Sequence, residues 1–230
     1  MIRKIKTIVL VFFALFAIPF TSGSFRGKFL DQNDLQEDRA RFWFNFYSKN
    51  ARKTFLQHLA NGEDFRIHIE SIFTSYGIPL ELYYLGLIES GYKRMAISKA
   101  RARGPWQFMA DTGIKYGLRV DSEIDERVDV SKSTRAAGKY LLDLYDIFHS
   151  WALASAAYNA GESKVLGAIR KGETRDLRIL CEKRFIPQET CDFVTKIWVA
   201  KELDLRRNEF GLPEFKRVNN SDQLFRSRSI

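Results

Sequence analysis

The chain has 230 residues, 45% of them hydrophobic and 14% aromatic, with 37 Lys and Arg against 28 Asp and Glu. That length is enough for one sizeable domain with its own core, and the apolar content excludes an intrinsically disordered chain. The formal net charge of +9 favours an anionic partner, such as a cell-wall polymer, a membrane surface or nucleic acid, although interspersed charges of both signs also suit an ordinary solvated surface.

The first 23 residues have the pattern of a secretory signal peptide. Arg3, Lys4 and Lys6 precede an apolar run over residues 8–20, and four small residues follow it. The run of 13 residues is too short for an ordinary spanning helix, but an uncleaved membrane anchor is the alternative, because no A-x-A site is present. Removal of residues 1–23 leaves 34 basic against 28 acidic residues, or +6. We therefore expect export to the periplasm or cell envelope, which argues against nucleic acid as the partner.

Helices are predicted almost throughout, because no sustained period-2 alternation is bounded by hairpin turns. Residues 24–62 are predicted to form an amphipathic helical arm, which a break at Asn61-Gly62 separates from the main domain, residues 63–210. Residues 211–230 are predicted to form a loosely ordered tail. The predicted fold class is therefore all-α, with minimal β structure.

The helices expected in the main domain follow from apolar spacing, from prolines at helix starts and from glycines at helix ends. Pro79, Pro105 and Pro187 each stand at the first position of a predicted helix, where the missing N–H has no intrahelical partner to lose. The expected helices are residues 67–77, 79–90, 105–117, 131–148, 151–158, 163–170 and 187–205.

The two cysteines, Cys181 and Cys191, have nine residues between them. In an oxidising compartment we expect a disulfide, with two unpaired buried thiols as the alternative, because spacing does not establish geometry. The three histidines are scattered along the sequence, and none forms a recognisable ligand pair with a cysteine. We therefore expect neither a metal site nor a cofactor.

Glu89 stands at the end of an apolar helix, where a carboxylate is unusual. Leu82, Leu85 and Gly86 lie one and two turns before it, which places the carboxyl on an apolar stripe. Burial and the negative end of the helix dipole both disfavour the ionised form, so they predict a raised pKa, as a general acid needs. Gly86 is expected to leave room for a substrate. The alternative is an ordinary glutamate at an exposed, frayed helix end.

Two further motifs accompany the Glu89-Ser90 pair. Residues 104–109 read GPWQFM, and residues 157–161 read AYNAG. Taken singly, the aromatic residues in them are more often core residues than ligand contacts. In kind, order and spacing, however, the three motifs together resemble those of the soluble lytic transglycosylase family, over residues 77–168.

The resemblance extends to two flanking segments, residues 125–145 and 186–203, which are similar to the membrane-bound transglycosylase D members of that family. The chain departs from the family pattern at Lys93-Arg94, where many members have Asn-Pro, and at Ala110, where proline is usual. We also expect no C-terminal LysM wall-binding repeats, which transglycosylase D members often carry. These departures concern the local shape of the groove and wall tethering, not the chemistry.

The resemblance implies a lysozyme-like α-helical domain that cleaves peptidoglycan between N-acetylmuramic acid and N-acetylglucosamine and leaves a 1,6-anhydro end. Glu89 would be the catalytic acid, and Tyr158 would orient it through a hydrogen bond. The residues implied to lie at the substrate are Ser90, Gln107, Met109, Tyr158 and Asn159. The expected partner is the peptidoglycan glycan strand, bound by a monomer, with membrane association if the N-terminal segment is kept.

A single acid is consistent with this chemistry. Ordinary glycosidases need two carboxylates, but Glu89 is the one acid in the motif set. An attack by the 6-hydroxyl of the muramic acid on its own anomeric carbon would be intramolecular and would gain a large effective molarity. Other acids lie in patterns typical of solvated or capping residues: Asp111, Asp121, Glu123, Asp125 and Glu126. The alternatives are a goose-lysozyme-like hydrolase that uses water, and a non-catalytic wall-binding protein on the same fold.

Overall fold

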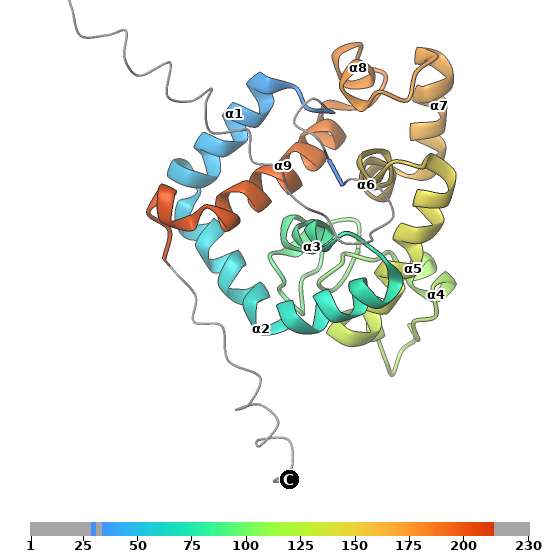
Figure 1. The fold of residues 1–230 in the computed structure, drawn as a ribbon. Coiled ribbons are helices and arrows are strands. Elements are labelled where there is room, and N and C mark those ends of the chain that lie inside the picture. The colour runs from blue at the N-terminus through green and yellow to red at the C-terminus, as the bar shows by residue number, and fades with distance from the viewer. Residues whose placement is uncertain (1–28, 31–33, 214–230) are drawn as a thin grey trace, which may run out of the picture.

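The computed structural model describes residues 29–30 and 34–213, which form α-helices joined by turns (Figure 1). The α-helices in chain order are α1 (Glu37–Asn45), α2 (Arg52–Tyr76), α3 (Tyr83–Ser90), α4 (Ala110–Lys115), α5 (Val130–Phe148), α6 (Trp151–Ala160), α7 (Glu162–Gly172), α8 (Leu177–Glu182) and α9 (Gln188–Leu205). Short helical turns lie at Phe46–Asn50, Leu80–Leu82, Glu126–Val128 and Arg207–Phe210. Over the described ranges, β structure amounts to isolated bridges, which confirms the predicted all-α class.

The expected signal peptide, residues 1–23, lies outside the described residues, as does the greater part of the expected tail. Within the described part of the chain, no helix has both the length and the apolar character needed to cross a membrane.

Helix α3 lies at the centre of the fold, where α2 and α9 pack against it (Figure 1). Its residues from Tyr83 to Leu87 are all buried. Helix α6 is equally buried from Trp151 to Ala157, and its many alanines let α5, α7 and α9 approach it closely. Helices α3 and α6 therefore run through the core, and the C-terminal residues of each are partly exposed.

The N-terminal arm is docked on the main domain. Helix α1 lies along α9 (Figure 1), and the Arg39 guanidinium donates to both carboxylate oxygens of Asp192, at 2.8 and 2.5 Å. The break predicted at Asn61-Gly62 is wrong, because α2 runs without interruption from Arg52 to Tyr76. The division of the chain at residue 62 stays a prediction, although no helix ends there.

Close packing explains why a glycine is tolerated in the middle of α2. A Cβ atom at Gly62 would lie 2.2 Å from the Tyr83 hydroxyl oxygen and 2.6 Å from the Tyr92 ring. The glycine therefore lets α2 approach these two tyrosines, and the gain in burial offsets the usual destabilisation by a helical glycine.

The helix predicted to begin at Pro105 begins instead at Ala110. Left-handed backbone angles at Gly104 (φ +83°) and Gln107 (φ +48°) fold the segment into a tight turn. Two hydrogen bonds close this turn, because Arg103 N donates to Phe108 O at 2.9 Å and Phe108 N donates to Arg103 O at 3.1 Å. We call residues 104–108 the Gly-Pro turn.

Other helix boundaries differ from the predicted ones by a few residues. Pro79 precedes a single 3-10 turn before α3 begins at Tyr83, and α6 continues through Ala160 instead of ending at Tyr158. Helix α8 was not expected from the sequence. Its first turn is capped by Asp176, whose Oδ1 accepts from Ile179 N at 3.0 Å.

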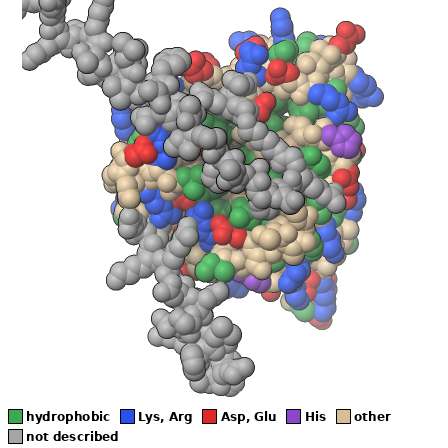
Figure 2. Space-filling view, in the orientation of Figure 1, with side chains coloured by type: hydrophobic (Ala, Val, Ile, Leu, Met, Phe, Trp, Pro, Cys, Tyr) green, Lys and Arg blue, Asp and Glu red, His purple; other side chains and the backbone are tan. Residues whose placement is uncertain are grey.

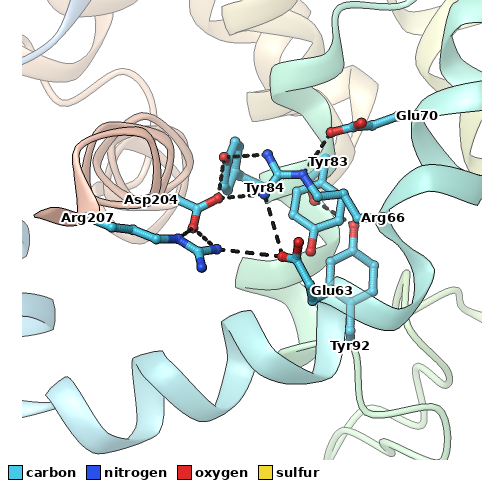
Figure 3. A network of polar contacts seen from close by, with 8 residues as sticks. All are labelled: Glu63, Arg66, Glu70, Tyr83, Tyr84, Tyr92, Asp204 and Arg207. Atoms are coloured by element: carbon cyan, nitrogen blue, oxygen red, sulfur yellow. Dashed lines mark hydrogen bonds and ion pairs between the residues drawn. The ribbon is translucent and has the colours of Figure 1, made fainter. Parts of the chain in front are cut away.

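A buried polar network joins α2, α3 and α9 (Figure 3). Arg66 pairs with Glu70 at 2.8 Å and with Asp204 at 2.7 Å. The Tyr84 hydroxyl donates to the same Asp204 carboxylate at 2.7 Å, and Arg207 binds that carboxylate from the end of α9. Because the partners come from three helices and are desolvated, their geometry is demanding. The network therefore fixes the start of α3 against both neighbours.

The structure joins Cys181 of α8 to Cys191 of α9 through a disulfide, with a sulfur–sulfur distance of 2.10 Å. Both residues are buried. The bridge attaches the short α8 to the first turns of α9. The oxidised state of the exported protein stays a prediction.

Candidate active site

Glu89 occupies the last turn of α3, which ends where Gly91 takes a left-handed conformation (φ +61°). The helix beneath it is apolar, with Leu82 and Leu85 fully buried, while Glu89 itself keeps partial exposure. Burial raises the pKa of the Glu89 carboxyl from 4.5 to about 8, as the sequence predicted. The side chain is therefore a carboxylic acid near neutral pH, at a position that a ligand can reach.

Ser90 and Tyr158 both bind the Gly-Pro turn. Ser90 Oγ donates to the carbonyl of Pro105 at 2.7 Å, and Tyr158 Oη donates to the carbonyl of Trp106 at 2.8 Å. Successive carbonyls of the turn are thus held by α3 on one side and by α6 on the other. These two hydrogen bonds therefore join the turn to the ends of both helices.

The predicted hydrogen bond between Tyr158 and Glu89 is wrong, because the hydroxyl hydrogen is directed to the Trp106 carbonyl and no bond to the carboxyl accompanies it. The two groups are nevertheless near each other. Burial is the main cause that raises the pKa of Tyr158 well above 10, and the charge of Glu89 is the second. Tyr158 and Glu89 are therefore neighbours without a direct hydrogen bond, and a role of Tyr158 in orienting the carboxyl stays a prediction.

Gln107 presents part of its side-chain amide to solvent. Its Nε2 donates to the carbonyls of Gly104, at 2.7 Å, and Ala96, at 3.3 Å, while its Oε1 has no partner among the described residues. Two residues along the chain, Met109 is 46% exposed. An acceptor oxygen and a polarisable thioether are thus available to a ligand beside the turn.

Asn159 lies at the exposed end of α6, and its Oδ1 accepts from Thr190 Oγ1 at 2.9 Å. This contact ties α6 to the beginning of α9. Its sequence neighbour Tyr158 faces the Gly-Pro turn, so the two adjacent residues bind different parts of the fold. Contact of Asn159 with a sugar stays a prediction.

Gly86 does not leave room for a substrate, contrary to expectation. A Cβ atom there would lie 2.9 Å from the Tyr92 hydroxyl oxygen and 3.0 Å from the ring. The Tyr92 ring fills this space, stacks on Tyr83 at a centroid distance of 5.0 Å and donates its hydroxyl hydrogen to the Tyr83 carbonyl at 2.6 Å. Tyr92 is therefore a buried support beneath the helix that carries the acid.

A buried arginine that the sequence analysis missed holds the other side of the Gly-Pro turn. Arg127 Nη1 donates to the carbonyls of Phe108, at 3.0 Å, and Arg101, at 3.2 Å. Its charge is balanced by Asp125, which accepts from Arg127 at 2.9 and 2.8 Å and from Arg103 at 3.0 Å. Asp125 caps a turn, as predicted, but it also neutralises this arginine. The segment has no periodicity that would reveal a buried arginine.

In the one view that Figure 2 gives, basic and acidic side chains are interspersed over the part of the surface that grey atoms leave visible. The described residues hold no group of three His, Cys, Asp or Glu side chains suited to a metal ion.

The comparisons with known proteins agree with the motifs. Residues 71–180 match the family model described as Transglycosylase SLT domain. This match over residues 71–180 confirms the predicted resemblance to the transglycosylase SLT domain family.

Among individual proteins, the chain is 31% identical over 191 residues to membrane-bound lytic murein transglycosylase D of Escherichia coli (strain K12), an alignment that covers 82% of this chain and 42% of that protein. It is 34% identical over 111 residues to a putative tributyltin chloride resistance protein of Alteromonas sp. (strain M-1), over 48% of this chain and 54% of that protein. The chain thus spans less than half the length of its Escherichia coli relative.

Proposed function

We propose that this chain is a peptidoglycan lytic transglycosylase, which cleaves the β-1,4 bond between N-acetylmuramic acid and N-acetylglucosamine and leaves a 1,6-anhydromuramic acid end. The observation that carries the proposal is the buried Glu89 carboxyl at the end of α3, where burial raises its pKa to about 8 and where Ser90 ties the helix end to the Gly-Pro turn. The family match over residues 71–180 and the similarity to a lytic murein transglycosylase support it. The site of action would be the cell envelope.

In the first step, the Glu89 carboxylic acid donates its proton to the 4-oxygen of the leaving N-acetylglucosamine while the glycosidic bond breaks. In the second step, the 6-hydroxyl of the muramic acid forms a bond to its own anomeric carbon and returns its proton to the Glu89 carboxylate. No water is consumed, and the acid is regenerated. The internal attack gains the effective molarity of a tethered nucleophile.

The surroundings of Glu89 favour this single-acid chemistry over a two-carboxylate hydrolase. In ordinary glycosidases the second carboxylate lies roughly 5 to 9.5 Å from the acid. A carboxylate at that range would raise the pKa of Glu89 by charge repulsion, but burial is the cause of the rise here. Within the described residues, no ion pair joins Glu89 to a basic side chain either.

The roles proposed for the remaining residues differ in kind. Gln107 and Met109 would contact the saccharide, because their exposed atoms lie beside the Gly-Pro turn. Ser90 and Tyr158 would hold that turn in place, and Asn159 would border the same site from the end of α6.

A digest of purified sacculi in ¹⁸O-labelled water tests the proposal. We expect released muropeptides to be one water lighter than hydrolysis products and to carry no ¹⁸O. Reducing ends that contain ¹⁸O would instead assign a goose-lysozyme-like hydrolase. The Glu89→Gln variant serves as the control, and an absence of products with the wild-type protein would favour a non-catalytic wall-binding role.

A further inference from the structure

The C-terminal end of α3 is held from outside by α2. Helix α3 ends at Ser90, and its last carbonyls have no partner within the helix. The carbonyl of Gly91, two residues after Glu89, accepts a hydrogen bond from Asn61 Nδ2 at 2.9 Å. This bond crosses from α2 to α3 and lies close to the proposed acid along the chain.

Asn61 is itself fixed by its own helix. Gln57, one turn earlier on α2, donates its Nε2 to Asn61 Oδ1 at 2.9 Å. With its oxygen occupied in this way, the Asn61 amide directs its NH₂ group to Gly91. These two hydrogen bonds together set the orientation of the Asn61 amide.

Two neighbours of Asn61 press α2 against the same region. A Cβ atom at Gly91 would lie 2.3 Å from the His58 ring, so the chain passes beneath His58 only because residue 91 is a glycine. Gly62, which follows Asn61 on α2, approaches Tyr83 and Tyr92 with a similarly close contact. His58, Asn61 and Gly62 thus share one face of α2, as their helical spacing requires, and this face covers the end of α3.

We infer that Asn61 is a positioning residue for the proposed catalytic acid, since it fixes the backbone just after Glu89 through the Gly91 carbonyl. Asn61 precedes the residues that match the family model, 71–180, so the catalytic unit would extend back into the segment expected to be an arm. The inference deepens the proposed function and rests on it.

The test compares Asn61→Ala with Asn45→Ala in the full chain. Asn45 is an exposed residue of α1 that donates to a backbone carbonyl, Arg41 O, at 3.0 Å, so its loss removes a similar bond far along the chain from α3. We expect Asn61→Ala to lower kcat roughly 10- to 100-fold, with KM within about twofold, because small misplacements of a catalytic group are costly. Asn45→Ala should leave both constants unchanged.

A pH–rate profile separates positioning from general damage to the fold. Each rate is divided by the folded fraction that circular dichroism measures at the same pH, because folding stability itself falls at alkaline pH. A displaced carboxyl would gain water, so the alkaline limb of the corrected Asn61→Ala profile should move to lower pH, whereas a general loss of folded protein would leave the corrected limb unmoved. An unchanged kcat and an unchanged limb would overturn the inference.

Two further variants keep the test decisive. If Asn61→Ala is not recovered folded, Gln57→Ala replaces it, because Gln57 is exposed and its loss frees the Asn61 amide. We expect Gln57→Ala to lower kcat about two- to fivefold. A wild-type kcat for Gln57→Ala would overturn the inference. Glu89→Gln is measured in parallel. An absence of anhydro products with the wild-type protein refutes the proposed function, and activity of Glu89→Gln refutes the role of Glu89 as its acid. An inactive Glu89→Gln beside a fully active Asn61→Ala refutes the positioning role alone.

Discussion

Replacement of Glu89 by glutamine should abolish turnover and at the same time stabilise the protein at alkaline pH. The folded-state pKa of about 8 lies above the ordinary value of 4.5, so the folded protein holds a proton that the unfolded chain releases between these pH values. The wild type therefore loses stability as pH rises from about 4.5 to about 8, and the loss is complete above that range. The glutamine side chain of the variant is neutral at every pH, so the variant does not lose this stability.

The magnitude follows from the same interval. The difference between 4.5 and about 8 corresponds to at most about 5 kcal/mol, at about 1.4 kcal/mol for each pH unit. Because the side chain keeps some contact with solvent, we expect roughly half of that, about 2 kcal/mol at pH 9. For a protein of this size, the melting temperature of Glu89→Gln should then exceed that of the wild type by about 4 to 8 °C at pH 9.

Thermal or urea unfolding of both proteins between pH 5 and pH 9 measures this difference, with Glu189→Gln at an exposed site on α9 as the control. The wild-type rate should also fall as pH rises through about 8, where the acid loses its proton. A stability difference that stays constant over this pH range would refute the burial argument. Retention of more than about a tenth of the rate by Glu89→Gln, a loss of under 1.4 kcal/mol in transition-state stabilisation, would refute the catalytic role.

Three further outcomes are expected. Tyr158→Phe should lower kcat/KM about tenfold and the free energy of unfolding by about 1 kcal/mol, because the Gly-Pro turn loses a hydrogen bond. A variant with wild-type kcat/KM would show that the hydroxyl does not contribute to catalysis. Unreduced protein from the periplasm should show no alkylated cysteine by intact mass, since the bridge between Cys181 and Cys191 closes a short loop and contributes up to about 3 kcal/mol; two labels would contradict it. Arg66→Met should lower the free energy of unfolding in urea by about 3 kcal/mol, because it removes a partner of the buried Asp204. A loss below about 1 kcal/mol would show that Arg207 alone balances the Asp204 charge.

The sequence by itself determined the helical class and the position of the acid. Helix periodicity is local, so the spacing of Leu82, Leu85 and Glu89 already places the carboxyl on an apolar stripe at a helix end, and the raised pKa follows from burial. The order of the three motifs likewise lies wholly in the sequence, and it indicated the family whose model matches residues 71–180.

Tertiary structure decided which groups meet. The motifs suggested the Glu89 carboxyl as the acceptor of the Tyr158 hydroxyl, but the packing of α6 against the Gly-Pro turn gives it the Trp106 carbonyl. Gly86 and Gly62 each looked locally like a gap or a break, but each makes way for an aromatic ring brought in from another part of the chain.

Arg127 and Asn61 show the same limit. Arg127 binds the Phe108 carbonyl from 19 residues away, and Asn61 binds the Gly91 carbonyl from 30 residues away. An amide or guanidinium donor can satisfy any nearby carbonyl, so its partner depends on which segments the packed core brings together. Local spacing therefore determines which face of a helix a residue occupies, whereas the packing of distant helices determines what lies opposite that face.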